Sequence, residues 1–175
     1  MTARRRKKLA RQVKQLVLAI LVLGALYLAE RFSETWDVPA GVAADALPAD
    51  AEGPCRVLHV IDGDTVRLRC GDDEMKVRLL RIDTPERDEP RYREAREALR
   101  RLVDGRDVHF TYEEPGQPTR GNYGRLLVYL HAGGKNVNVE MVRAGWSAFD
   151  TRWGEGRFAS AFRAAEREAR QAGRL

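Results

Sequence analysis

The fold is decided by residues 55–82, which read CRVLHVIDGDTVRLRCGDDEMKVRLLRI. Apolar and polar residues alternate here in the way that is typical of half-buried strands. The expected strands run from Cys55 to Asp62, from Thr65 to Cys70 and from Met75 to Ile82. Turn residues separate them at 62–64 and 71–73, and Gly63 is expected to take a positive φ. The stretch therefore predicts a three-stranded meander.

The remainder of the chain predicts two more strands and about three helices. The strands are expected over 108–112 and 126–130, and the helices over 92–103, 138–144 and 158–172. Asn138 is the expected N-cap of the second of these helices, because asparagine side chains accept bonds from helix amides. Short strands interrupted by helices favour an α+β fold with a five-stranded Greek-key barrel of the OB type, preceded by an N-terminal hydrophobic helix.

Charge is distributed unevenly along the chain. The 175 residues have a net charge of +5, but residues 1–31 hold eight basic residues and one acidic residue. Residues 32–53 hold five acidic residues and no basic one, and residues 54–175 hold 23 basic and 20 acidic residues. Of these 23, 21 are arginine, the residue that binds phosphate through two parallel hydrogen bonds. We therefore divide the chain into an N-terminal segment, an acidic linker and a folded domain with these bounds.

The N-terminal segment has the order of an export signal. Basic residues precede an uninterrupted apolar run from Leu16 to Ala29. We expect an uncleaved signal anchor that crosses the membrane of the cell envelope through residues 13–29, with the folded domain extracytoplasmic. Secretion after signal cleavage remains the alternative. No other stretch is apolar enough to enter a bilayer, which excludes a polytopic membrane protein.

Two cysteines cannot build a disulfide scaffold, but these two are placed to pair. In a hairpin centred on Gly63, the numbers of facing residues sum to 126, and Cys55 and Cys70 miss this register by one place. A bulge or slight offset would bring them within bonding distance. The sequence favours a Cys55–Cys70 disulfide, which fits an exported domain. Two buried free thiols are the alternative.

Acidic residues are expected to converge at one edge of the barrel. Asp64 follows the first turn and Asp83 is expected to end the third strand, and in a meander both points lie on the same rim. Converging carboxylates repel each other unless a cation lies between them. Oxygen ligands favour Ca²⁺ or Mg²⁺, and Pro85 favours an exposed Thr84 carbonyl as a further ligand. The pattern predicts a site for a divalent cation.

Two arginines accompany these carboxylates. Arg78 lies inside the third strand, where a guanidinium is unfavourable without an anion, and Arg125 directly precedes the fifth strand. With a cation they would form a receptacle for a phosphodiester and stabilise its developing charge. Glu86 is then a candidate base or water-positioning group. Each residue also has an ordinary interpretation, such as a plain turn or a solvent-facing strand position.

Four motifs carry these residues in order. They are VIDGDTV at 60–66, RLLRIDTPE at 78–86, YGR at 123–125 and VEMVRAG at 139–145. Together they resemble the staphylococcal nuclease (thermonuclease) family, and the resemblance runs from about Val57 to Leu175. It implies an OB-type barrel and Ca²⁺-dependent hydrolysis of phosphodiester bonds in DNA and RNA, with cleavage of the bond to the 5′ oxygen.

The resemblance also implies roles for the acidic residues. Asp64 and Asp83 resemble the family's calcium carboxylates, and Thr84 resembles its backbone-carbonyl ligand. Asp62 resembles a nearby acid that acts at most through water. The implied cofactor is therefore Ca²⁺.

Further roles follow for the substrate side. Arg78 and Arg125 resemble the family's phosphate-binding arginines, and Glu86 resembles the residue that activates the attacking water. Tyr123 resembles a tyrosine beside the bound nucleotide. Trp153 stands where the family has a tyrosine and would supply an aromatic face for a base.

These observations predict a calcium-dependent endonuclease, a phosphodiesterase that acts on DNA, RNA or both with little sequence preference. It is expected to be exported and tethered to the membrane. No protein partner is implied, and a monomer is expected. The alternative is a non-catalytic OB-type module that binds nucleic acid or protein at the cell envelope.

Overall fold

The computed structural model describes residues 47–175. The predicted anchor, residues 1–31, and its membrane segment, 13–29, lie outside the described residues. Within residues 47–175, no helix has both the length and the apolar character needed to cross a membrane. The first strand begins at Glu52, so the barrel takes in the last two residues of the segment 32–53 that the sequence assigns to the linker.

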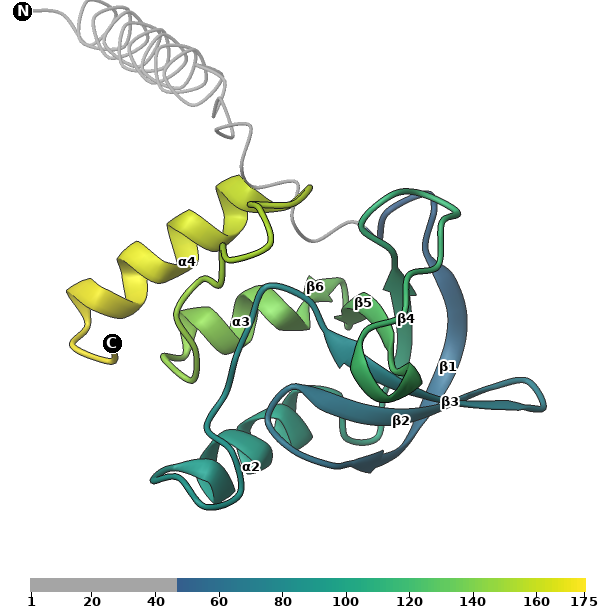
Figure 1. Cartoon of the computed structure of the whole chain (residues 1–175), viewed down its shortest axis with the longest axis horizontal. Helices are drawn as coiled ribbons and strands as arrows, with labels where there is room; N and C mark the ends of the chain where they lie inside the picture. The colour runs from purple at the N-terminus through teal and green to yellow at the C-terminus, as the bar shows by residue number, and fades with distance from the viewer. Residues whose placement is uncertain (1–46) are drawn as a thin grey trace, which may run out of the picture. The chain divides into compact units, whose positions relative to one another are not determined.

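Five strands close into a barrel (Figure 1). They are β1 (Glu52–Val60), β2 (Thr65–Cys70), β3 (Asp73–Leu79), β4 (Asp107–Thr111) and β5 (Leu126–Ala132). Their order is β3-β2-β1-β4-β5, and a parallel pairing of β3 with β5 closes the sheet on itself. A two-residue strand, β6 (Lys135–Asn136), pairs antiparallel with the end of β5. The predicted five-stranded barrel of the OB type is confirmed.

Three α-helices accompany the barrel and gather on one side of it (Figure 1). They are α2 (Tyr92–Val103), α3 (Val137–Arg143) and α4 (Ala159–Gln171). A short 3₁₀ helix, η2 (Asn122–Gly124), precedes β5. Each α-helix lies within one residue of its predicted bounds, because its apolar positions recur at helical spacing and are buried against the barrel.

The N-cap of α3 differs from the expectation. Asn136 is the cap, and its side chain accepts a hydrogen bond from the Val139 amide at 3.2 Å. The predicted cap, Asn138, is instead fully buried and ties α3 to the barrel. Its oxygen accepts from the Leu130 amide at 2.9 Å, and its nitrogen donates to the carbonyls of Leu80 and Val128 at 2.9 and 3.1 Å. A buried amide satisfied in this way fixes the helix against the sheet.

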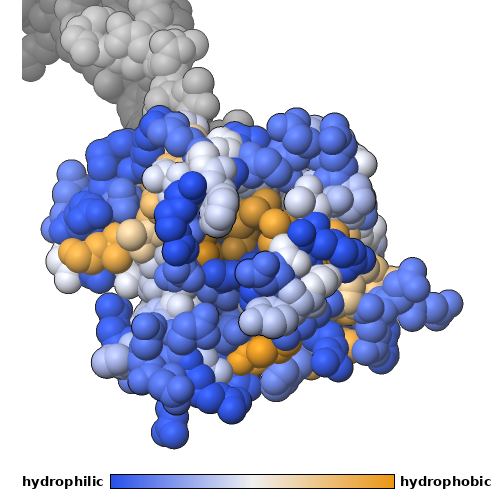
Figure 2. Space-filling model, in the orientation of Figure 1, coloured by the Kyte–Doolittle hydropathy of each residue, from blue (hydrophilic) through white to orange (hydrophobic). Residues whose placement is uncertain are grey.

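The hydrophobic core fills the interior of the barrel and the space between the barrel and the helices. Its largest fully buried side chains include Tyr129, Phe110, Phe162, Leu68, Leu79 and Ile82. The face seen in Figure 2 is mostly hydrophilic, and hydrophobic surface shows only in small patches between polar side chains. Burial of this size is the main stabilising contribution to such a domain.

The third strand is shorter than predicted. β3 ends at Leu79 and not at Ile82. Arg81 takes a left-handed φ of 63°, which lies outside the strand region of backbone conformation. Asp83 therefore lies in the segment after the strand and not at its end. The Ser147 hydroxyl oxygen accepts a hydrogen bond from the Asp83 amide at 2.9 Å, which fastens this segment to the connection between α3 and α4.

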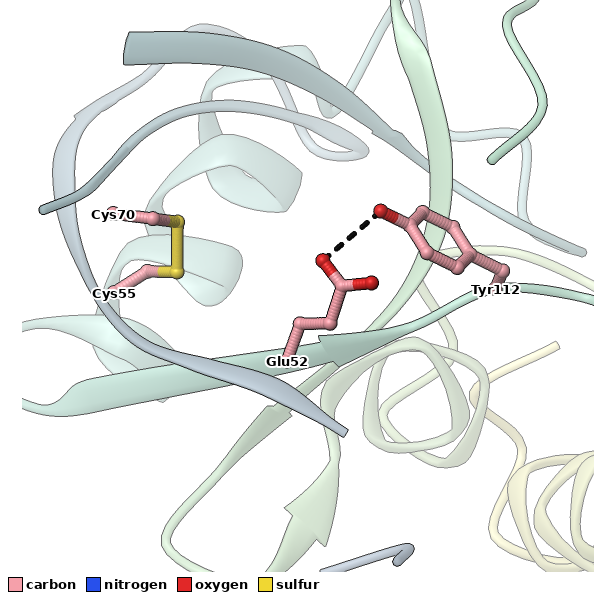
Figure 3. Close-up of a disulfide and its surroundings, with 4 residues drawn as sticks. All are labelled: Glu52, Cys55, Cys70 and Tyr112. Atoms are coloured by element: carbon pink, nitrogen blue, oxygen red, sulfur yellow. Dashed lines mark hydrogen bonds between the residues drawn. A yellow bond between two sulfur atoms is a disulfide. The ribbon is translucent and has the colours of Figure 1, made fainter. Parts of the chain in front are cut away.

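A bulge sets the register of the first hairpin. Near the turn Val60 faces Val66, in the register that sums to 126, but beyond a bulge at Leu58 the partners shift by one. The shift places Cys55 beside Cys70, and the two cysteines form a disulfide between β1 and β2 (Figure 3). Figure 3 also shows the hydrogen bond of 3.1 Å that Tyr112 donates to Glu52 at the start of β1.

Candidate active site

The turn between β1 and β2 presents Asp64 to the interior. The Ile61 and Asp62 amides both donate to the Thr65 carbonyl, at 2.9 and 3.3 Å, and Tyr92 of α2 donates to the Ile61 carbonyl at 3.2 Å. Asp62 accepts from the Asp64 amide at 3.2 Å and so caps its own turn. Asp64 ends the turn, directly before β2, and is only 4% exposed.

Gly63 is required for a reason other than the one expected. It is not among the glycines with positive φ. A Cβ atom at this position would lie 2.6 Å from Thr84 Oγ1 and 3.1 Å from Ala95 Cβ. The turn therefore packs directly against the Asp83–Thr84 segment and α2, and only glycine permits this approach.

Asp64 is the hydrogen-bond acceptor that joins the turn to the segment after β3. Its Oδ2 accepts from the Thr84 amide at 3.1 Å and from the Thr84 hydroxyl at 3.0 Å. Its Oδ1 accepts from the Thr65 hydroxyl at 3.0 Å. These bonds fix the direction of a buried carboxylate.

Arg78 lies between the two predicted metal carboxylates. Its Nη2 donates to Asp83 Oδ1 at 3.0 Å, and its Nη1 forms an ion pair with Asp64 Oδ2. Although it contacts Asp64, this buried Nη1 lacks the geometry of a hydrogen bond. Burial lowers the pKa of Arg78 below its usual value, and the positive charge of Arg125 acts in the same direction, while Asp83 and Asp62 oppose the shift. The structure thus brings Asp64, Asp83 and Arg78 together.

Arg125 belongs to the same edge. Its Nη1 donates to the Thr65 hydroxyl at 3.3 Å, and its Nε donates to the Asn122 carbonyl at 3.2 Å. Neither partner is a carboxylate, so these contacts leave its positive charge uncompensated. Thr65 also donates to Asp64, which links Arg125 to the Arg78 pair through one hydroxyl. Two guanidinium groups therefore lie at one rim of the barrel.

Sequence reasoning missed a third arginine at this edge, Arg152. Its Nη2 donates to Asp83 Oδ2 at 2.7 Å, and its Nε donates to Asp150 Oδ1 at 2.9 Å. The hydrogen bond to Asp150, followed by the one to Asp83, raises the pKa of Arg152. Asp83 is thus held by Arg78 on one oxygen and by Arg152 on the other. The only signal in the sequence was its place directly before Trp153.

The other predicted site residues are exposed. Glu86 lies three residues after Asp83, and among the described residues its carboxylate has no hydrogen-bond partner. Tyr123 is 93% exposed and Trp153 is 85% exposed. The Arg125 guanidinium lies 5.8 Å from the Tyr123 ring. Both rings are therefore accessible from solvent.

One cavity lies apart from the predicted site residues. A cavity of about 490 Å³ lies between β1 and α2, and residues 56–60, 96, 100 and 103–107 line it. None of the predicted site residues is among them.

Comparison with known proteins agrees with this architecture. Residues 76–174 match the family described as staphylococcal nuclease homologue. An uncharacterized endonuclease of Escherichia coli is 39% identical over 100 residues, which cover 57% of this chain and 61% of the relative. An uncharacterized endonuclease of Haemophilus influenzae is 33% identical over 92 residues, which cover 52% of this chain and 49% of the relative. The SPbeta prophage-derived endonuclease YokF of Bacillus subtilis is 29% identical over 93 residues, which cover 50% of this chain and 31% of the relative.

The closed barrel, with arginines and carboxylates at one rim, defines an OB-type domain. The family match covers more than half of the 175 residues. The chain therefore belongs to the family of staphylococcal nuclease homologues, as its motifs indicated. It spans 61% of the length of the Escherichia coli relative and less of the other two.

Proposed function

We propose that the chain is a nuclease that hydrolyses phosphodiester bonds of DNA, RNA or both, with little sequence preference. The observation that carries the proposal is the position of Arg78, whose guanidinium contacts the carboxylates of Asp64 and Asp83 from two separate segments. Membership of the family, and relatives that are named endonucleases, support this reaction class. The whole-chain activity is our inference from these observations.

The proposed cofactor is Ca²⁺. Residues 47–175 contain no group of three or more His, Cys, Asp or Glu side chains able to hold a metal ion. Such a site would depend on two carboxylates, the Thr84 carbonyl and water. The donors fit this, because Asp64 and Asp83 already share one cationic partner, and oxygen ligands suit Ca²⁺. A bound ion would neutralise charge on the phosphate and favour ionisation of a water molecule.

The chain's own side chains would carry the remaining steps. Arg78 and Arg125 would bind the non-bridging phosphate oxygens and stabilise the charge that develops on them. Glu86, which is exposed and three residues from Asp83, would accept a proton from the attacking water. The water oxygen forms a bond to phosphorus, the bond to the 5′ oxygen breaks, and solvent protonates the leaving oxygen. The products carry a 3′-phosphate and a 5′-hydroxyl.

The exposed rings would bind nucleotides beside this centre. Tyr123 lies two residues before Arg125, and Trp153 directly follows Arg152. A base stacked on either ring would set the position of the phosphate relative to the arginines. Stacking on an aromatic face depends little on base identity, which agrees with the proposed lack of sequence preference.

We also propose that residues 13–29 tether the enzyme to the cell envelope with the barrel outside the cytoplasm. The basic flank followed by an apolar run supports this. Cell fractionation of the full chain and of a version lacking residues 1–31 tests it. The full chain should be recovered with membranes and the shortened chain in the soluble fraction, and recovery of both in the soluble fraction would contradict the tether.

Digestion of circular DNA tests the nuclease proposal. Purified protein should degrade it with Ca²⁺, and EDTA should abolish degradation until Ca²⁺ is restored. A circular substrate has no ends, so its loss also demonstrates endonucleolytic cleavage. Equal degradation in EDTA would contradict the role of the metal. No degradation of DNA or RNA with either Ca²⁺ or Mg²⁺ would favour the alternative of a non-catalytic binding module.

A further inference from the structure

The loop formed by residues 150–157 carries Arg152 and Trp153, and Arg81, in the segment after β3, holds it. The Arg81 side chain donates from Nη1 to the Gly154 carbonyl at 2.7 Å. The Arg81 carbonyl accepts from the Asp150 amide at 3.0 Å. Arg81 is therefore bonded to the loop at two points, one on each side of Arg152 and Trp153.

Beneath the loop, Arg81 is part of a network with Tyr129 of β5 and with Glu113, which follows β4. Arg81 Nη2 donates to Glu113 Oε2 at 3.0 Å, and the Tyr129 hydroxyl donates to the same oxygen at 2.6 Å. The other Glu113 oxygen, Oε1, accepts from the Arg157 amide at 3.0 Å, at the far end of the loop. Burial alone would lower the pKa of Arg81, but its bond to Tyr129 and the charge of Glu113 raise it overall. The network thus holds a charged arginine whose side chain is only 8% exposed.

Gly156 shows how closely the loop lies on this network. A Cβ atom at this position would be 2.7 Å from Arg81 Nε and 2.9 Å from Glu113 Oε1. Gly156 also has a φ of 75°, which side-chain-bearing residues rarely adopt. The loop backbone therefore rests directly on the Arg81–Glu113 pair, with no space between them.

The backbone of Arg81 adds a second constraint. Its φ of 63° is unfavourable for arginine, and the network keeps it in this conformation. Asp83 follows two residues later, and Arg152 of the loop donates to it at 2.7 Å. The same short segment after β3 therefore holds both the loop and a carboxylate of the candidate site.

We propose that Arg81 and Glu113 are positioning residues, which hold the 150–157 loop so that Trp153 can stack on a nucleotide bound at the Asp83 edge. This inference rests on the proposed nuclease function. The two residues would act through Trp153 and would not touch the substrate themselves. The loss of either should therefore weaken nucleic-acid binding with little change in the chemical step.

Two variants test the inference in the full chain. Arg81→Gly removes the side chain and keeps a residue suited to the left-handed φ. Glu113→Gln keeps the shape of the side chain at position 113 but removes the negative charge of its carboxylate. The matched control is Arg91→Gly, because Arg91 also has a left-handed φ of 69° and contacts Gly145 and Trp146 instead of the loop. Thermal unfolding of each variant shows whether it folds.

Binding is measured in EDTA, by the anisotropy of a labelled single-stranded oligonucleotide. Both variants should bind about 5- to 100-fold more weakly, the range expected for the loss of one stacked base. With Ca²⁺, KM should rise by a similar factor while kcat stays within about threefold. The Arg91→Gly control should match the parent in binding and in kinetics.

In a Trp153→Ala background, Arg81→Gly should weaken binding far less, because the residue through which it acts is absent.

Other results would overturn the inference. Unchanged binding by both variants, with only a lower melting temperature, would make the network purely structural. An equally large effect of Arg81→Gly with and without Trp153 would show that it does not act through this ring. If Arg81→Gly does not fold, Glu113→Gln decides the question. A parent that binds but does not cleave contradicts the nuclease proposal alone, whereas a parent that does neither contradicts both.

Discussion

Asp64 accepts two hydrogen bonds from Thr84, one from its amide at 3.1 Å and one from its hydroxyl at 3.0 Å. The residues are 20 positions apart, in the turn before β2 and in the segment after β3. Their contact shows that the two segments predicted to meet at one rim do meet. It also makes the site sensitive to Gly63, which directly precedes Asp64 and packs against Thr84.

Gly63→Ala should therefore disturb both folding and activity. The added Cβ would lie 2.6 Å from Thr84 Oγ1, so Thr84 and Asp64 must move apart. We expect a loss of about 1–3 kcal/mol in the free energy of unfolding, as for other overpacked positions, together with reduced DNA cleavage. Urea denaturation and a cleavage assay measure the two effects. Gly71→Asn, at an open left-handed turn position, is the control and should retain activity.

Arg78→Ala, Arg125→Ala and Glu86→Ala should each lower the cleavage rate by about 10²-fold or more, because each removes a proposed transition-state contact. The two arginine variants should differ in folding stability. Arg78→Ala leaves Asp64, which is 4% exposed, without its ionic partner, and should lose about 3 kcal/mol of folding free energy.

Arg125→Ala breaks no ion pair with a carboxylate in the described part of the chain and should unfold close to the parent's melting temperature. For all three site variants, single-turnover kinetics measures the cleavage rate and thermal unfolding measures the stability. Arg167→Ala and Glu94→Ala, on exposed faces of α4 and α2, are the controls. Parental cleavage rates in all three site variants would show that the proposed roles are wrong.

Arg152→Ala should strengthen the binding of Ca²⁺. In the structure Arg152 occupies one oxygen of Asp83, at 2.7 Å, and a metal ion would have to displace it. An exposed ion pair of this kind is weak, so we expect a gain of about two- to fivefold in affinity. Titration calorimetry with CaCl₂ in the absence of nucleic acid measures it. Unchanged or weaker binding, with Arg167→Ala as the control, would show that Arg152 does not compete with the ion.

Reduction of the Cys55–Cys70 disulfide should destabilise the domain. The bond closes a loop with a sequence separation of 15, for which the chain-entropy estimate is about 3 kcal/mol. Dithiothreitol should lower the melting temperature of the parent but leave a Cys55→Ala/Cys70→Ala variant unchanged. Labelling of two thiols in oxidised native protein would contradict this prediction.

His131 should make the domain less stable in acid. It is 4% exposed, and burial lowers its pKa in the folded protein from 6.5 to about 4. The unfolded chain therefore binds a proton first as the pH falls. The contribution of neutral His131 is fully present above pH 6.5 and is lost as the pH falls to about 4, for a total of about 3 kcal/mol.

Urea denaturation between pH 4 and 7 measures this effect. His131→Gln should flatten the pH dependence of the unfolding free energy by about this amount. Identical pH profiles for the parent and His131→Gln would contradict the prediction.

The patterns in the sequence predicted most of the barrel because its strands are short and alternate cleanly. The hairpin register around Gly63 followed from counting residues, whereas Cys55 and Cys70 missed that register by one place and needed the bulge near Leu58 to meet. The end of β3 did not, because the left-handed backbone of Arg81 depends on partners that lie far along the chain. The roles predicted for the site residues are still predictions.

Side-chain partnerships between loops were also beyond sequence reasoning. Arg152 and Asp83 meet across 69 positions, and no periodic pattern marks such a pair. Gly63 was recognised as a turn residue, but its actual requirement is space for Thr84. Local patterns predict elements, whereas the contacts that complete the candidate site depend on how loops pack after the barrel has closed.

The parallel pairing of β3 with β5 is the seam at which the barrel closes, and Val77 faces Leu126 in its register. Arg78 and Arg125 come from the two sides of that seam. The phosphate receptacle that we propose would therefore need both halves of the chain, because one arginine comes from each side of the seam. An unfolded chain would lack the proposed activity, which would begin only once this last pairing had formed.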